Sequence, residues 1–132
     1  STDDKMGING FLPFDCDTSS PLRLVWSGRP NGTGTYGWTV RWAWVNDGDA
    51  LVSGNPAVPT TNSRSLIISK AATVDKKVTF EANLNIEEMV SRKDGGFGDE
   101  LWVSIQPTTL PATFTLGASQ ITYTKWCEGG HI

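Results

Sequence analysis

Two pairs of adjacent carboxylates, Glu87-Glu88 and Asp99-Glu100, are the residues of this sequence best suited to acid–base chemistry. A glycoside hydrolase would need two carboxyl groups that face each other about 5–10 Å apart across a cleft. The sequence indicates no such cleft, and acidic side chains are mostly exposed in proteins. We therefore interpret both pairs as solvated strand ends.

The acidic residues around the glycine-rich segment 93–99 could bind a metal ion instead. Asp94, Asp99 and Glu100 carry oxygens of the kind that ligate calcium. The alternating Asp/Asn spacing of an EF-hand loop is lacking, however. The sequence therefore does not predict a calcium site.

His131 is the only histidine and the penultimate residue, a position where fraying is expected. Nucleophilic catalysis needs a base that supporting contacts hold in place, so we expect neither a Ser/His/Asp triad nor a Cys/His dyad at a chain end. A metal site of Cys127 and His131 would need further ligands, which only Cys16 or a carboxylate could supply. We predict that the protein is not an enzyme and has neither a metal site nor a cofactor.

The two cysteines, Cys16 and Cys127, lie near opposite ends of the sequence. If the terminal strands are neighbours, a disulfide across so long a loop would contribute up to ~4–5 kcal/mol in the chain-entropy model. The alternative is two reduced, buried thiols, as expected in a reducing compartment. The sequence leaves both alternatives open.

The six tryptophans of the chain are the remaining candidates for residues that bind a ligand or a partner. Trp38, Trp42 and Trp44 alternate along one segment and share a face with Val40. Such a stripe is more typical of a core than of a sugar-binding platform.

Two further tryptophans break the burial pattern. Trp102 lies opposite the apolar face of its segment, and Trp126 does the same in a later segment. We expect both on an outer surface. An exposed Trp on the outer face of a sheet is typical of an interface with another subunit or with a ligand.

Alternation with a period of two residues dominates every long segment, which predicts strands and no helix longer than about two turns. The predicted strands are residues 22–27, 38–45, 50–53, 65–70, 77–84, 101–106, 114–116 and 121–126. The segment from Pro107 to Pro111 is expected to end the strand before it. The predicted fold class is all-β: an antiparallel β-sandwich, in the form of a jelly roll, with an extended N-terminal arm.

The same alternation identifies the side chains expected to face the core. They are Val40, Trp42, Trp44, Leu66, Ile68, Val78, Phe80, Leu101, Val103 and Ile105.

We predict an N-terminal arm over residues 1–15, followed by the sandwich domain over residues 16–132. The arm starts polar yet carries apolar side chains that a free tail has no reason to hold together. An extended arm can add main-chain hydrogen bonds to the sheet edge of a neighbour. The candidate interface residues are Phe11, Leu12, Phe14, Trp102 and Trp126.

Length and charge limit the partners. The 132 residues fit one domain. A net charge of −3, without any Lys/Arg run longer than two, lacks the footprint of a nucleic-acid binder. No apolar segment approaches the ~20 residues needed to span a bilayer, and the first residues lack the features of a signal peptide. We expect neither nucleic acid nor membrane as a partner, and synthesis in the cytoplasm.

Four segments carry a resemblance to known proteins: Gly10-Phe11-Leu12-Pro13-Phe14-Asp15, Arg41-Trp42-Ala43-Trp44, Glu100-Leu101-Trp102-Val103-Ser104-Ile105 and Leu116-Gly117-Ala118-Ser119-Gln120-Ile121-Thr122-Tyr123. Their order resembles that of small, jelly-roll-like β-sandwich domains in structural proteins of tailed bacteriophages. In those domains an aromatic-rich strand follows an early tryptophan and a Leu-Gly strand closes the domain. The resemblance runs from Phe11 to Tyr123.

The resemblance implies a virion protein on the capsid surface, synthesised in the cytoplasm of a bacterial host. Such domains are similar to capsid decoration or cement proteins, which bind the assembled shell and commonly trimerise at local threefold axes. The implied partners are the major capsid protein and further copies of the chain, as a homotrimer. The alternative is a carbohydrate- or receptor-binding module of a phage fibre, with a surface glycan as ligand. The short chain, without a shaft or a repeat, favours decoration.

Overall fold

The computed structural model describes residues 6–11, 16–17, 19–45, 51–52, 58–59, 63–86 and 100–125. These residues form nine strands and no helix. The strands are β1 (Met6–Phe11), β2 (Leu22–Pro30), β3 (Gly34–Val45), β4 (Leu51–Val52), β5 (Val58–Pro59), β6 (Ser63–Ala72), β7 (Val78–Leu84), β8 (Glu100–Thr109) and β9 (Phe114–Thr122).

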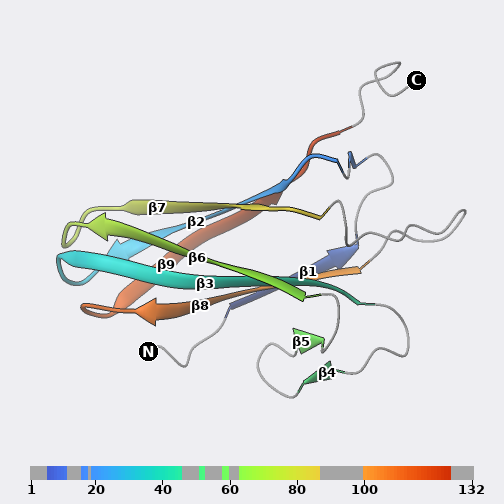
Figure 1. Cartoon of the computed structure of the whole chain (residues 1–132). Helices are drawn as coiled ribbons and strands as arrows, with labels where there is room; N and C mark the ends of the chain where they lie inside the picture. The colour runs from blue at the N-terminus through green and yellow to red at the C-terminus, as the bar shows by residue number, and fades with distance from the viewer. Residues whose placement is uncertain are drawn as a thin grey trace, which may run out of the picture.

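Seven of the strands make up two antiparallel sheets that pack face to face as two layers (Figure 1). One sheet has the order β1-β8-β3-β6 and the other the order β7-β2-β9. The short strands β4 and β5 pair with each other, and β5 contacts β3. The predicted all-β class and antiparallel β-sandwich are therefore confirmed.

The long-range strand pairs are nested inside one another. β1 pairs with β8, β2 with β7, β3 with β6 and β4 with β5. A long hairpin folded over into two layers gives this nesting, which jelly rolls share. Here, however, β4 and β5 form a separate two-stranded sheet and do not extend the second layer. β9 is an addition, because it follows the nested set and pairs with β2.

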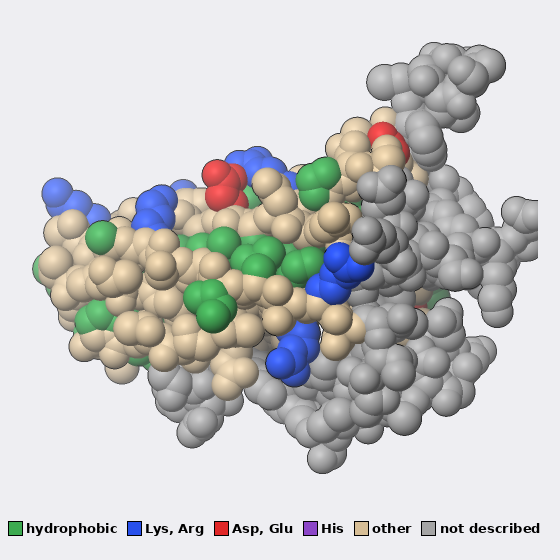
Figure 2. Space-filling view, viewed as in Figure 1, with side chains coloured by type: hydrophobic (Ala, Val, Ile, Leu, Met, Phe, Trp, Pro, Cys, Tyr) green, Lys and Arg blue, Asp and Glu red, His purple; other side chains and the backbone are tan. Residues whose placement is uncertain are grey.

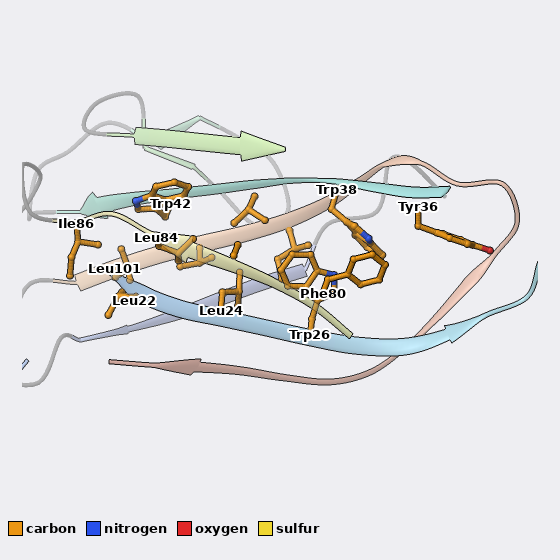
Figure 3. Packing of buried hydrophobic residues seen from close by; sticks show 14 of the residues in the cluster. Leu22, Leu24, Trp26, Tyr36, Trp38, Trp42, Phe80, Leu84, Ile86 and Leu101 are labelled. Atoms are coloured by element: carbon orange, nitrogen blue, oxygen red, sulfur yellow. The ribbon is translucent and has the colours of Figure 1, made fainter. Parts of the chain in front are cut away.

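The core fills the space between the two sheets (Figure 3). Strand β7 shows most regularly how a strand contributes to it, with buried and exposed residues in strict alternation. The rings of Trp26, Trp38, Phe80 and Phe114 form one contiguous cluster. Full burial of a large apolar side chain contributes about 1.5–3 kcal/mol, so this cluster is a main source of stability.

The predicted core residues lie where alternation placed them. Two of them, Leu66 and Ile68, are partly buried against the core, and the side chain of Trp44 lies outside the described part of the chain. The fully buried ones are Val40, Trp42, Val78, Phe80, Leu101, Val103 and Ile105.

The first strand covers residues that the sequence assigned to the arm. Residues 6–11 are extended, as predicted, but they pair in regular register with β8 of the same chain. Met6 and Ile8 pack against the core. Gly7, Asn9 and Gly10 mask this alternation in the sequence. The sandwich therefore includes residues that precede the domain boundary predicted at residue 16.

The end of β8 corrects another expectation. The strand continues through Pro107 to Thr109, although Pro107 was expected to end it. β1 pairs with β8 only as far as Ile105, so beyond this point β3 is the one paired strand among the described residues. Proline lacks an N–H to donate and is tolerated where one side of a strand has no partner.

The last strand also differs from its prediction, because β9 is one strand where the sequence indicated two. A register shift opposite Trp26 and Gly28 interrupts the alternation, which explains why the pattern looked broken. A Cβ at Gly28 would overlap the Thr115 carbonyl oxygen and the Phe114 ring. Glycine at this position therefore allows β9 to approach β2 closely.

Candidate interaction surface

Trp102 lies on the outer face of the four-stranded sheet, as its position in the alternation predicted. Its neighbours Leu101 and Val103 point into the core, whereas Trp102 is half-buried. The indole Nε1 donates a hydrogen bond of 2.6 Å to Glu100 Oε1. The polar end of the indole thus has a partner within the chain, while part of the ring faces solvent.

Phe11 lies next to this tryptophan in the sheet register. It ends β1 directly opposite Glu100, the residue that binds Trp102. The Phe11 side chain is 66% exposed, which is unusual for a phenylalanine at the end of a paired strand. We call Phe11, Glu100 and Trp102 the aromatic corner. It presents two aromatic side chains and one carboxylate on the outer face of one sheet.

The remaining side chain near the aromatic corner is small. Ala43, on β3, is directly opposite Trp102 in register and is only 1% exposed. The sheet surface at this place is therefore shielded from water. The chain itself covers Ala43, so Phe11 and Trp102 make up the apolar surface that a partner can reach at the corner.

Three of the five predicted interface residues cannot be placed in this corner. Leu12, Phe14 and Trp126 lie outside the described residues. Phe11 and Trp102 are brought together by the pairing of β1 with β8, which alternation alone does not predict.

Two of the tryptophans of β3 are core residues and not a ligand platform. Trp38 and Trp42 are both buried, and Trp42 Nε1 donates a 3.0 Å hydrogen bond to the Asn85 carbonyl oxygen. The core interpretation made from their spacing is therefore confirmed. A glycan could not reach either ring in this fold.

The acidic and metal candidates are mostly outside the described part of the chain. This applies to Glu87, Glu88, Asp94, Asp99 and His131, whereas Glu100 belongs to the aromatic corner. The described residues include no group of three or more His, Cys, Asp or Glu side chains that could hold a metal ion.

Cys16 is a buried residue in an isolated antiparallel bridge with Lys125. The bridge brings the beginning and the end of the described chain side by side, as the disulfide alternative required. Cys127 lies outside the described residues, so the choice between a disulfide and two thiols stays as the sequence left it.

Two shallow depressions mark the rest of the described surface. One, of ≈ 290 Å³, lies over β7, β2 and β9 and is lined by small polar residues such as Ser27, Thr79 and Ser119. The other, of ≈ 380 Å³, includes Lys70 and Glu81. Lys70 Nζ donates to the Thr79 carbonyl oxygen at 2.9 Å, and Glu81 pairs with an arginine. Neither depression contains two facing carboxylates or an exposed aromatic platform.

Ile67 is a further exposed apolar residue, which the sequence did not single out as an interface candidate. It lies on β6 and is 74% exposed on the outer face of the four-stranded sheet, opposite Thr39. Its outward direction agrees with the prediction that Leu66 and Ile68 face the core.

Comparison of the chain with protein-family models, with curated proteins and with solved structures finds no match. No helix long and apolar enough to cross a bilayer occurs in the part of the chain that the structure describes.

Proposed function

We propose that this protein is a bacteriophage virion structural protein that decorates the capsid. It binds the assembled shell as an oligomer and holds neighbouring capsid subunits together. The observation that carries the proposal is the aromatic corner, an exposed Phe11 and a half-exposed Trp102 fixed on the outer face of one sheet. The order of segments resembles that of phage β-sandwich domains, and this resemblance supports a role in a phage virion.

The geometry of the corner favours protein contact. Trp102 is oriented by its hydrogen bond to Glu100, so little side-chain freedom is left to lose when a partner covers the ring. Trp is also enriched among the residues that dominate interface energies. Phe11 adds apolar area on the neighbouring strand.

The mechanism is mass action. A protein that binds the assembled shell and not its separated subunits stabilises the shell by an amount that grows with its concentration over the dissociation constant. No covalent chemistry is needed. The rigid sandwich serves to hold the corner in one geometry.

Co-sedimentation with capsids that lack the protein tests the proposal. We expect the wild-type chain to saturate the shells and Trp102→Ala to bind on the order of tenfold more weakly or worse, because truncation of a central interface Trp costs at least ~2 kcal/mol. Thermal unfolding of the free variant shows whether its fold is intact. No binding by the wild-type chain would refute decoration.

Ile67→Ala is the matched control. Ile67 is also an exposed apolar residue on the outer face of the same sheet, but it lies on the far edge strand β6. The control should bind shells as the wild type does. Equal losses for both variants would show that the corner has no special role.

A carbohydrate- or receptor-binding module is the second candidate, favoured by the half-exposed and oriented indole of Trp102. Such a ring is what a sugar platform requires. Titration with glycans, followed by Trp fluorescence in the wild type and in Trp102→Phe, separates the two. A saturable signal lost in the variant, without shell binding, would favour the fibre module.

A further inference from the structure

The sandwich has four sheet edges, and they differ in how they are protected against pairing with another chain. The edge strands are β1 and β6 in one sheet and β7 and β9 in the other. An edge strand presents unpaired N–H and C=O groups, and natural proteins block it with charges, prolines, bulges or short length. An edge without any of these is open to strand addition.

Charged side chains protect the edges β6 and β7. β6 carries Arg64 and Lys70, and β7 carries Glu81. β6 contacts β7, so the two edges lie on the same side of the sandwich. Figure 2, in the same view as Figure 1, shows basic and acidic side chains around a band of hydrophobic ones on this molecular face.

A bulge protects the third edge. β9 has no charged residue, but its register shifts opposite Trp26 and Gly28. An irregular strand cannot offer a continuous row of evenly spaced hydrogen-bonding groups to a partner. β9 is therefore a poor template along its length.

The fourth edge, β1, has none of these devices among the described residues, where β8 is its one paired strand. Its sequence MGINGF has no charge and no proline, and its six residues pair with β8 without a register shift. Gly7 and Gly10 are exposed, and a Cβ at Gly10 would meet no atom within 4 Å. Every second residue of an edge strand points its N–H and C=O away from the sheet.

We propose that β1 is a homodimer interface, in which β1 pairs antiparallel with the β1 of a second copy about a two-fold axis at Asn9. The two four-stranded sheets then form one continuous sheet across the dimer. This inference rests on the edges and not on the proposed function. It gives a dimer, unlike the trimer that the resemblance implies.

The register explains why the occupant is a second copy. A two-fold axis perpendicular to the sheet places the outer faces of both copies on the same side of the joined sheet. When the axis passes through Asn9, each residue of β1 lies opposite the residue of the other copy whose number makes the sum eighteen. Phe11 of one copy then lies opposite Gly7 of the other, on the outer face of both. An exposed aromatic ring across from a glycine covers the bare backbone, a pairing that stabilises glycines at sheet edges.

The electrostatics fit a symmetric partner. Two copies of a charged edge would bring like charges onto the same seam, which is unfavourable. β1 has no charge to repel its copy.

Sedimentation velocity of the full chain tests the proposal. We expect a dimer for the wild type and a monomer for Gly10→Lys, because the new charge lies at the seam. The open space at Gly10 lets the variant fold with an unchanged thermal midpoint. Ala71→Lys, which adds the same charge to the exposed edge β6, is the control and should stay dimeric.

The outcomes are distinct. A wild type that is monomeric or trimeric overturns the proposal, and so does a folded Gly10→Lys that remains a dimer. If Gly10→Lys does not fold, Phe11→Ser replaces it, and we expect its dimer dissociation constant to rise on the order of tenfold. An unchanged constant for Phe11→Ser would count against the register.

Cross-linking tests the register directly. At the two-fold axis residue 9 faces its own copy at a Cα separation of about 4.5–5.5 Å, which suits a disulfide. Mild oxidation should therefore link Asn9→Cys into a covalent dimer. Gly7→Cys should not react, because its copies are roughly 13 Å apart along the strand. Oxidation of the wild type measures the cross-linking that the native cysteines cause. A covalent dimer linked through position 7 and not through position 9 would overturn the register.

Discussion

Trp26 and Trp38 meet edge to face between the two sheets, with ring centroids 5.9 Å apart and ring planes at 79°. Trp26 comes from β2 and Trp38 from β3, so this contact joins the layers. Both indole N–H groups are buried without a hydrogen-bond partner in the described part of the chain. Trp42, by contrast, donates to the Asn85 carbonyl oxygen.

This difference predicts unequal costs for the same substitution. Trp42→Phe loses a hydrogen bond and leaves a carbonyl without its donor, whereas Trp38→Phe removes an N–H that has no acceptor. Both lose the same volume. We expect Trp38→Phe to be the less destabilising by about 1–2 kcal/mol, measured by urea unfolding. Equal free energies of unfolding would show that the Trp38 N–H has an acceptor.

Phe80 is the central ring of the aromatic cluster. It stacks on Trp26 at 5.6 Å and meets Trp38 at 5.4 Å between ring centroids. Phe80→Ala should therefore lower the free energy of unfolding by ~3–5 kcal/mol. Ile67→Ala is the surface control and should change it by less than about 0.5 kcal/mol. An unchanged thermal midpoint in Phe80→Ala would remove this ring from the core.

Two glycines should respond differently to the same methyl group. Gly28→Ala forces a Cβ into the Thr115 carbonyl and the Phe114 ring, and overpacking of this kind costs about 1–3 kcal/mol. At Gly10 a Cβ meets no atom within 4 Å, so Gly10→Ala should be neutral within about 0.5 kcal/mol. Denaturant unfolding of both variants checks this contrast, which fails if Gly28→Ala is as stable as Gly10→Ala.

Removal of residues 1–10 should destabilise the sandwich. The sequence favoured the opposite outcome, since a free arm contributes little to a core. Met6 and Ile8 pack against the core, however, and β8 loses one of its two pairing partners when β1 is deleted. We expect a lower thermal midpoint and loss of amide protection along β8 in hydrogen exchange. A deletion variant with wild-type stability would show that β1 is dispensable.

Asp17 should titrate at lower pH than an ordinary aspartate. The hydroxyl of Ser19 donates to Asp17 Oδ1 at 2.6 Å and is the main cause that lowers the pKa of this carboxyl. Because the folded-state pKa is depressed, the contribution of Asp17 to stability is present above the unfolded-state pKa and is lost as the pH falls through the folded one. NMR titration should show the pKa rise in Ser19→Ala. A pKa that does not move in that variant would contradict the assignment.

Alternation was sufficient to predict strands β2, β3, β6, β7 and β8 and the core residues that they contribute. In β7 and β8 the apolar face is continuous, and every predicted core residue there is buried. The outward position of Trp102 followed from the same parity. Which side chains of a strand are buried depends on the face they lie on, and the two faces alternate along the sequence. A pattern with a period of two is therefore enough to predict these features.

Features that depend on pairing could not be predicted in this way. β1 has only Met6 and Ile8 as inward apolar residues, with glycine between and after them, so its sequence looked like an arm. The bulge in β9 split its alternation into two short segments. The proximity of Phe11 to Glu100 depends on the register of strands far apart in the chain, which local patterns do not record.

The nesting of the strand pairs bears on the order of events during folding. Met6 pairs with Ile105, so nearly the whole chain must be synthesised before β1 can find its partner. Closure of so long a loop costs entropy before any contact compensates for it, and folds rich in non-local pairs fold in milliseconds to seconds. Among the described strands, β1 waits longest during synthesis for its first pairing partner, because β8 follows it by about ninety residues. The strand with the least protected edge is therefore also the one that stays unpaired longest.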